Sequence, residues 1–199
     1  IAIVGAGNVG SASAAAIAAR RIGDVYLYDT VPDLSLGKAM DINHARIFFH
    51  TDCSVVGCNS FEDLAGADLV VVTAGAPRRD GMKRRDLLDE NLCAMGEVVR
   101  GIMRCCPRAV VLVVTNPVEI LTRFLHERWP QMKVWGLGCT LDTVRLRYFL
   151  AEAARVSIDS VSAIVIGTHD DQMIPLVRHA TIGGALAEQV LPAARIRQA

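Results

Sequence analysis

The sequence lacks an excess of charge of either sign. Its 199 residues include 21 Lys and Arg and 21 Asp and Glu, so the formal net charge is zero. Without a general basic surface, a protein can bind nucleic acid or an anionic membrane only through a strong local patch. The one short basic cluster, over residues 78–86, contains a glycine, and by itself it fits a solvated charged loop as well as a loop that closes over a small anion. We therefore expect neither nucleic acid nor a membrane as a partner.

Long apolar runs, targeting signals and paired cysteines are missing as well. No apolar run approaches the roughly 18 to 20 residues that span a bilayer. The chain opens on a strand-like segment, residues 1–4, with no basic region and no cleavage site. The six cysteines include no CxxC pair and no regular spacing, which argues against a zinc site and against a disulfide framework. We expect a cytoplasmic protein with free thiols and no metal.

The composition, 52% hydrophobic and 21% charged, is that of a chain that folds around a sizeable core. Short β-branched runs alternate with longer helical stretches. The strand-like runs are residues 1–4, 25–28, 54–56, 69–72, 110–114 and 134–137. Helical patterns cover residues 11–21 and 87–104. This alternation predicts an α/β fold with a parallel sheet covered on both faces.

The pattern changes after residue 137. Residues 142–154 are predicted to form a helix, residues 161–166 and 173–177 two strands, and residues from Leu186 onward another helix. We place a domain boundary at Gly138. This predicts an α/β domain over residues 1–138 and an α+β part over residues 139–199.

A glycine-rich turn links the first strand to the first helix. Gly5, Gly7 and Gly10 form a GxGxxG motif, in which one glycine permits the turn, one lets the backbone approach a pyrophosphate and one packs the helix close. The next strand ends at Asp29, where a carboxylate accepts hydrogen bonds from the adenosine ribose and repels a 2′-phosphate. The motif predicts a Rossmann dinucleotide-binding domain that prefers NAD to NADP. An FAD or nucleoside-sugar site uses the same fold, so the motif alone assigns no reaction.

Polar side chains follow the other predicted strands. Asn116 lies after the fifth strand, and Asp142 and Arg145 share a face at the start of a helix. His169 follows a later strand, and a histidine that meets an aspartate is suited to general acid/base chemistry. A metal site over residues 169–171 remains an alternative, although adjacent residues of a strand point to opposite faces.

The order of these motifs resembles that of the lactate and malate dehydrogenase family, over the entire chain. Two of the matching stretches, GKAMDINHA and GCTLD, are most similar to the malate dehydrogenases that resemble lactate dehydrogenase. The matching stretches are GAGNVG (5–10), GKAMDINHA (37–45), TAGAPRRDGMKRRDLLDEN (73–91), TNPVEILT (115–122), GLGCTLDTVRLR (136–147) and GTHDDQMIP (167–175).

The resemblance implies a role for each catalytic position. His169 matches the residue that donates and accepts the proton, and Asp142 matches its carboxylate partner. Arg145 matches the arginine that binds the substrate's C1 carboxylate through two parallel hydrogen bonds. Arg84 matches the lid arginine that polarises the carbonyl, and Asn116 the amide that contacts the same oxygen.

The substrate follows from one further position. Arg78 matches the specificity residue, which is typically Gln in lactate dehydrogenases. An arginine there can pair with a second carboxylate, so the resemblance favours oxaloacetate over pyruvate. Arg79 and Arg85 are neighbouring cations, but Arg78 and Arg84 keep the family spacing. The expected reaction is the reversible, NAD-dependent oxidation of (S)-malate to oxaloacetate.

The resemblance also implies a cofactor site and a homo-oligomer, either a dimer or a tetramer. NAD is expected to contact Gly5, Gly7, Asn8, Val9, Gly10, Asp29, Thr73, Ala74, Gly75, Asn91, Val114 and Asn116.

Two features depart from the family pattern. Asp170 stands where the family usually has Gly, and the chain is shorter than its relatives, so the substrate domain is expected to be incomplete. Two alternatives remain open: a lactate or other 2-hydroxy acid dehydrogenase, and a truncated NAD-binding protein without turnover.

Overall fold

A computed structural model describes residues 1–76, 84–169 and 172–198, and these residues form two compact units. The first unit spans Ile1–Gly136 and the second Leu137–Ala199. Each is built around its own cluster of buried apolar side chains.

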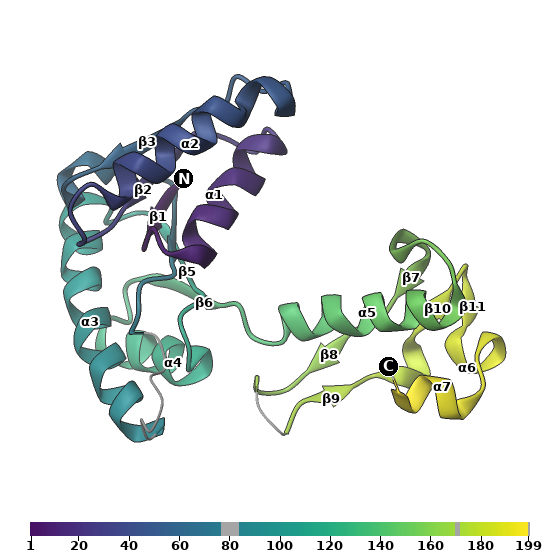
Figure 1. Ribbon diagram of the computed structural model, residues 1–199. Helices are drawn as coiled ribbons and strands as arrows, with labels where there is room; N and C mark the ends of the chain where they lie inside the picture. The colour runs from purple at the N-terminus through teal and green to yellow at the C-terminus, as the bar shows by residue number, and fades with distance from the viewer. Residues whose placement is uncertain (77–83, 170–171, 199) are drawn as a thin grey trace. The chain divides into compact units, whose positions relative to one another are not determined.

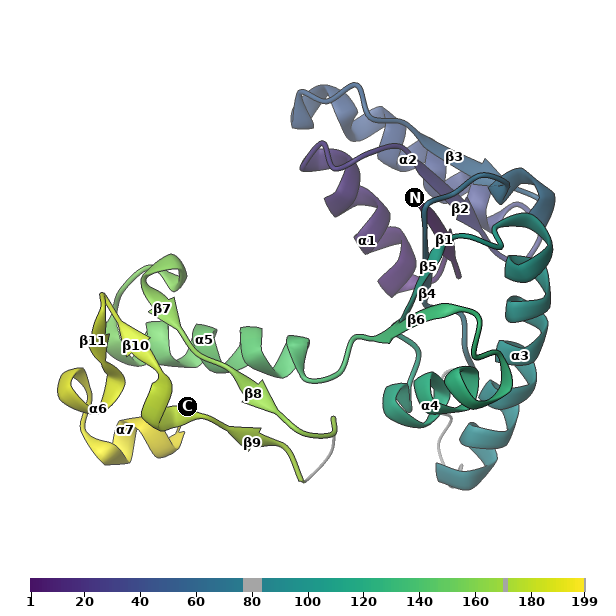
Figure 2. The same cartoon turned by 180° about the vertical axis from the view of Figure 1, so that it is seen from behind.

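The first unit contains a six-stranded parallel sheet with the strand order β3-β2-β1-β4-β5-β6 (Figures 1 and 2). Buried valine and isoleucine side chains dominate its central strands, as expected for a sheet covered on both faces. The sheet confirms the predicted α/β fold. Its strands are β1 (Ala2–Val4), β2 (Val25–Tyr28), β3 (Val55–Cys58), β4 (Leu69–Val72), β5 (Val110–Val113) and β6 (Lys133–Gly136).

Helices connect successive strands of this sheet. The helix after β1 is rich in alanine. Its buried Gly10, Ala14 and Ala18 recur every four residues, so a stripe of small residues faces the sheet. Figures 1 and 2 show this helix beside α2. The helices of the first unit are α1 (Asn8–Ala19), α2 (Leu34–Phe49), the 3-10 helix η1 (Phe61–Leu64), α3 (Arg84–Cys105) and α4 (Val118–Arg128).

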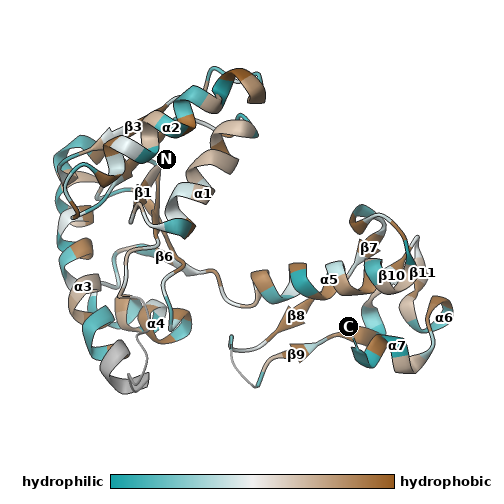
Figure 3. Ribbon diagram, in the orientation of Figure 1, coloured by the Kyte–Doolittle hydropathy of each residue, from teal (hydrophilic) through white to brown (hydrophobic). Residues whose placement is uncertain are grey.

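Helix α2 has no counterpart among the helices expected from the periodicity. It buries Ala39 and Ile42, but it also exposes Met40, Ile47 and Phe48, the last two by 73% and 81%. Figure 3 accordingly shows both hydrophobic and hydrophilic residues along this helix. Apolar residues on both faces weaken the helical period in the sequence, which is why the pattern did not reveal α2.

The strand order reverses next to β1. From β1 the chain proceeds outward through β2 and β3, and then returns to place β4 on the other side of β1. The connections on the two sides of this point diverge, which leaves a crevice at the carboxyl ends of β1 and β4. Ligands of open α/β sheets bind in such a crevice.

The second unit is an α+β arrangement, as predicted, built on the long helix α5 (Thr140–Ala154) (Figure 1). Leu146 and Leu150 of this helix pack against Val161, Ala180 and Ile182. A three-stranded antiparallel sheet has the order β11-β10-β7, and β8 and β9 form a separate antiparallel pair. The other elements are η2 (Ile158–Ser160), β7 (Val161–Ser162), β8 (Val165–Ile166), β9 (Ile174–Pro175), η3 (Val177–His179), β10 (Thr181–Ile182), β11 (Ala185–Leu186), α6 (Ala187–Val190) and α7 (Ala193–Gln198).

Two expected elements of this unit are divided. The strand expected over residues 161–166 is split into β7 and β8, because its two ends pair with different partners, β10 and β9. The helix expected from Leu186 onward is split into α6 and α7 around Pro192, which has no N–H to continue a helix.

Across the described ranges, no helix combines the length and the apolar character that crossing a bilayer requires.

Differences in burial predict different thiol reactivity for three of the six cysteines. Desolvation raises the pKa of the Cys58 thiol to about 11, and burial also raises the pKa of Cys106, whereas Cys93 is exposed. The thiolate is the nucleophile, and at pH 8 roughly one Cys58 in a thousand is a thiolate.

We expect iodoacetamide to modify Cys93 well before Cys58, as followed by peptide mass spectrometry. The unfolded protein is the control, in which the two should react alike; equal rates in the native protein would contradict the buried position of Cys58.

Candidate active site

The glycine turn between β1 and α1 uses its three glycines in three different ways. Gly5 has a φ of +109°, and a Cβ there would lie 2.6 Å from the amide nitrogen of Ala74. A Cβ on Gly10 would lie 1.8 Å from the carbonyl oxygen of Gly5, so the first turn of α1 packs directly on the loop. Around Gly7 no atom lies within 4 Å of the Cβ position. The loop therefore exposes its backbone at Gly7, just before the first amides of α1.

Asp29 braces this loop from the end of β2. Its Oδ2 accepts a hydrogen bond of 2.6 Å from the amide of Ala6, and its Oδ1 accepts one of 2.9 Å from the amide of Val31. Each carboxylate oxygen can accept a further hydrogen bond, because an ionised carboxylate has about four acceptor sites. The side chain is half-buried beside the glycine turn.

A cavity of about 820 Å³ lies at this edge of the first unit. Its size is within the range of pockets that hold small molecules and cofactors. Six of the residues expected to contact the cofactor line it: Gly5, Gly7, Asp29, Thr73, Ala74 and Gly75. Asn8, Val9 and Gly10 lie in the first turn of α1, directly after the loop.

Side-chain hydrogen bonds tie the ends of β1, β4 and β5 together. Thr73 Oγ1 donates to the carbonyl of Gly5 (2.9 Å), and Thr115 Oγ1 donates to that of Ala74 (2.7 Å). The buried Asn91, from α3, accepts from the amide of Ala76 (2.8 Å) and donates to the carbonyl of Asn116 (2.8 Å).

The remaining residues expected to contact the cofactor differ in their surroundings. Asn91 connects two strand-end loops through its side chain, whereas Asn116 is exposed after β5. Val114 packs against the core of the first unit.

Sequence reasoning missed the aromatic wall of this cavity. Phe61 lines it, its ring centroid lies 4.6 Å from that of Tyr28, and a Cβ on Gly101 would lie 2.6 Å from its ring. The signal was Gly101 itself, because a glycine inside a helix indicates a close packing partner.

In the second unit, Asp142 and His169 are in contact. Nδ1 of His169 lies 2.6 Å from Oδ2 of Asp142, and Arg145 Nη1 donates to Oδ1 of the same carboxylate at 3.2 Å. The Asp142 side chain is only 7% exposed, against 27% for His169 and 57% for Arg145. A buried carboxylate is costly unless it is paired and hydrogen-bonded, and here a cation and an imidazole both pair with it.

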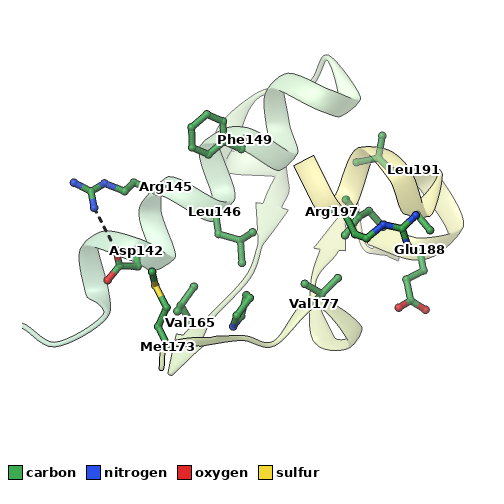
Figure 4. A pocket seen from close by; sticks show the side chains of 13 residues that line it. Asp142, Arg145, Leu146, Phe149, Val165, Met173, Val177, Glu188, Leu191 and Arg197 are labelled. Atoms are coloured by element: carbon green, nitrogen blue, oxygen red, sulfur yellow. Dashed lines mark hydrogen bonds and ion pairs between the residues drawn. The ribbon is translucent and has the colours of Figure 1, made fainter. Parts of the chain in front are cut away.

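A second cavity, of about 1030 Å³, lies next to this group and entirely within the second unit. Figure 4 shows Asp142 and Arg145 at one end of it and Glu188 and Arg197 at the other. Most of the wall between them is apolar, and includes Leu146, Phe149, Val165, Val177, Leu191 and Ile196. This surface is far more apolar than a site for a small dicarboxylate requires.

Part of the expected site lies outside the described residues. Arg78, the expected specificity residue, belongs to residues 77–83, and Asp170 to residues 170–171. Arg84 is the first residue of α3, and its side chain also falls outside the description. Within the described ranges, no three or more His, Cys, Asp or Glu side chains are grouped so as to hold a metal ion.

Comparison with known proteins gives a consistent picture. Residues 1–136 match the model of the lactate/malate dehydrogenase NAD binding domain, and residues 139–198 that of the lactate/malate dehydrogenase alpha/beta C-terminal domain. Malate dehydrogenase of Caulobacter vibrioides is 43% identical over 186 residues, which cover 92% of this chain and 58% of that protein. Malate dehydrogenase of Thermoplasma acidophilum is 38% identical over 203 residues, covering 98% and 62%.

Solved structures agree. Apo malate dehydrogenase of Picrophilus torridus superposes with a TM-score of 0.93 at 36% identity, covering 99% of this chain and 63% of that one. A Cryptosporidium parvum lactate dehydrogenase complexed with lactic acid and nicotinamide adenine dinucleotide has a TM-score of 0.89 at 31% identity, covering 99% and 64%. The chain thus spans about three fifths of the length of these relatives.

The glycine turn allows a test that separates folding from cofactor binding. Gly10→Ala should destabilise the first unit by roughly 1–3 kcal/mol or more, because the new methyl group overlaps the Gly5 carbonyl. Gly7→Ala should leave stability nearly unchanged, since its φ of −65° suits alanine and its Cβ position is open. It should instead weaken NADH binding by about tenfold or more, as the methyl group occupies the space in front of the loop.

Urea unfolding followed by tryptophan fluorescence and NADH titration measure the two effects. Both tryptophans, Trp129 and Trp135, lie in the first unit, so their fluorescence reports on this unit. Unchanged NADH affinity in Gly7→Ala would exclude the glycine turn as the cofactor contact.

Proposed function

Because the chain belongs to the lactate/malate dehydrogenase family, we propose that it is the greater part of a malate dehydrogenase, which interconverts (S)-malate and oxaloacetate with NAD. The observation that carries this proposal is the pairing of His169 with the buried Asp142, beside the cation Arg145. An acid/base group and a carboxylate-binding group are what the reduction of a 2-oxo acid needs.

His169 is the proposed proton donor and acceptor. The Asp142 carboxylate on Nδ1 holds one tautomer of the imidazole and stabilises the imidazolium, which directs proton exchange to Nε2. In oxaloacetate reduction the imidazolium gives its proton to the oxygen that becomes the hydroxyl, and in malate oxidation the neutral imidazole takes that proton back.

Arg145 is the proposed ligand of the substrate's C1 carboxylate. Its guanidinium has five N–H donors, of which the bond to Asp142 uses one, and the group is 57% exposed. Two parallel hydrogen bonds to a carboxylate would orient the substrate as well as bind it.

The cavity of the first unit suits NAD, the cofactor of this family domain. The exposed backbone at Gly7 and the amides of α1 would hold the pyrophosphate, and Asp29 would accept hydrogen bonds from the adenosine ribose. When bound, the reduced cofactor supplies the hydride that is added to C2 of the substrate.

The other roles are proposed from the sequence. Arg84 would polarise the substrate carbonyl, and Asn116 would donate to the same oxygen as negative charge develops on it. Arg78 would pair with the second carboxylate of oxaloacetate, which pyruvate lacks. The similarity to a lactate dehydrogenase structure supports a second candidate, a dehydrogenase of a monocarboxylic 2-hydroxy acid, and the two candidates differ in the role of Arg78.

We further propose that the active form is a homo-oligomer in a reducing compartment such as the cytoplasm. The exposed apolar residues of α2, among them Leu36, Met40, Ile47 and Phe48, form a surface that a second copy could cover. All six cysteines lie within the described ranges and none of them forms a disulfide bond, which suits a reducing compartment.

His169→Asn tests the acid/base assignment. The variant should lose roughly 10² to 10⁴ in kcat for oxaloacetate, because asparagine cannot donate the proton. NADH affinity should be unchanged, since the cofactor cavity is lined by the first unit. The measurement is NADH absorbance, with His179→Asn as a control for an exposed histidine of the same unit. Near-normal turnover by His169→Asn would exclude the assignment.

The assay should be run on this chain and on a version extended to the length of its relatives. We expect turnover of oxaloacetate by the extended version, because the added polypeptide can cover the apolar cavity beside Asp142 and Arg145 and so close the proposed substrate site. An extended version that binds NADH without turnover would support a cofactor-binding protein instead.

Arg78→Gln tests the substrate. Removing the charge-assisted pair should shift the preference from oxaloacetate toward pyruvate by roughly 10- to 100-fold in kcat/KM, the equivalent of about 1.5–3 kcal/mol. Arg79→Gln is the matched control and should leave the preference in place. If Arg79→Gln shifts the preference and Arg78→Gln does not, the proposed specificity position is wrong by one residue.

A further inference from the structure

The first turn of α5 holds the strand that leads to His169 through a second side chain. The Thr143 hydroxyl accepts a hydrogen bond from the amide of Val165 (2.9 Å) and donates one to the carbonyl of the same residue (3.4 Å). Thr143 is adjacent to Asp142, so one turn of the helix contacts both the strand, at Val165, and His169, which lies three residues beyond the strand.

The register of the β8–β9 pair explains why Val165 needs this partner. Hydrogen-bonded and non-hydrogen-bonded pairs alternate along an antiparallel ladder. The amide of Leu176 donates to the carbonyl of Ile164 (2.9 Å), so the next pair, Val165 with Pro175, is the non-hydrogen-bonded kind. Both backbone groups of Val165 therefore point away from β9, where a proline has no N–H to offer.

Burial makes this pairing consequential. Val165 is only 7% exposed, and a buried backbone group without a partner costs about 1–3 kcal/mol. A hydroxyl is both a donor and an acceptor, so the single side chain of Thr143 satisfies both groups.

A second contact from the same helix turn acts in the same direction. Cys139 Sγ lies 3.3 Å from the carbonyl oxygen of Gly167, where the chain turns with a φ of +101°. Val165, Gly167 and His169 alternate along the chain, and each meets a side chain from the start of α5.

We propose that Thr143 is a positioning residue, whose hydroxyl holds β8 against α5 and thereby sets the distance between His169 and Asp142. For catalysis this rests on the proposed function. The effect of Thr143 on the hydrogen bond between His169 and Asp142 does not rest on it, because that hydrogen bond can be measured without turnover. A displacement of an acid/base group by about 1 Å can cost as much as 100-fold in rate.

Thr143→Val and Thr143→Ser are the test. Valine keeps the shape of threonine but leaves both backbone groups of Val165 unpaired, whereas serine keeps the hydroxyl. In the extended enzyme, Thr143→Val should lower kcat by roughly 10- to 100-fold with little change in the KM for NADH, and Thr143→Ser should restore most of it.

A spectroscopic measurement tests the contact without turnover. A His169 Nδ1 proton held by Asp142 gives a downfield NMR resonance that exchanges slowly with water, and His169→Asn identifies it. This resonance should weaken or vanish in Thr143→Val and persist in Thr143→Ser. Thr140→Val is the matched control, because its hydroxyl bonds the nearby carbonyl of Leu137 (2.7 Å) rather than the β8 strand. It should keep both kcat and the resonance.

The outcomes are distinguishable. A folded Thr143→Val with normal kcat and an unchanged resonance would overturn the proposal, as would a serine variant as impaired as the valine one. If Thr143→Val does not fold, Thr143→Ala replaces it, since the smaller side chain lets water reach Val165. Should the unaltered extended chain show no turnover while the resonance behaves as expected, the dehydrogenase proposal fails and the positioning of His169 by Thr143 stands.

Discussion

A close approach of backbone segments at the carboxyl ends of β1, β4 and β5 is the constraint on which the first unit depends. Gly5 meets the amide of Ala74, Gly10 meets the carbonyl of Gly5, and Gly75 would place a Cβ 2.5 Å from the side chain of Thr115. Because no side chain fits at these positions, α1 begins directly at the sheet and its amides face the crevice. The cavity beside the glycine turn, the bracing of that turn by Asp29 and the buried Asn91 all follow from this geometry.

In the second unit, a buried carboxylate takes the corresponding place. Asp142 is stable at the start of α5 because Arg145 and His169 pair with it, and the short β8–β9 pair brings His169 to it. Strands of two residues are weak by themselves, so contacts from α5 have to hold the β8–β9 pair in place. For the proposed acid/base role, a histidine on the short β8–β9 pair that is held by a rigid helix combines accurate positioning with room for a substrate.

The cavity of the second unit extends from this polar group along a mostly apolar wall. The chain matches only about three fifths of its relatives' length. The polar end of the cavity, at Asp142 and Arg145, carries the proposed chemistry, while the apolar wall is suited to packing against polypeptide. The end at Asp142 and Arg145 and the apolar wall beside it thus have different proposed partners.

The sequence by itself determined the class of fold, the place of the cavity beside the glycine turn and the residue types of the proposed chemistry. It could do so because the GxGxxG turn, the carboxylate after β2 and the alternation of strands and helices are local patterns with local physical causes. It did not reveal α2, whose two faces are both apolar, or the division of residues 161–166 between two sheets.

Only the tertiary structure decided how distant residues meet. Asn91 as a brace between two loops, Phe61 as a wall of the cavity and Thr143 as the partner of Val165 depend on contacts between segments that no local pattern relates. The 2.6 Å contact between Asp142 and His169 is of the same kind, since a motif can supply both side chains but only packing sets the distance between them.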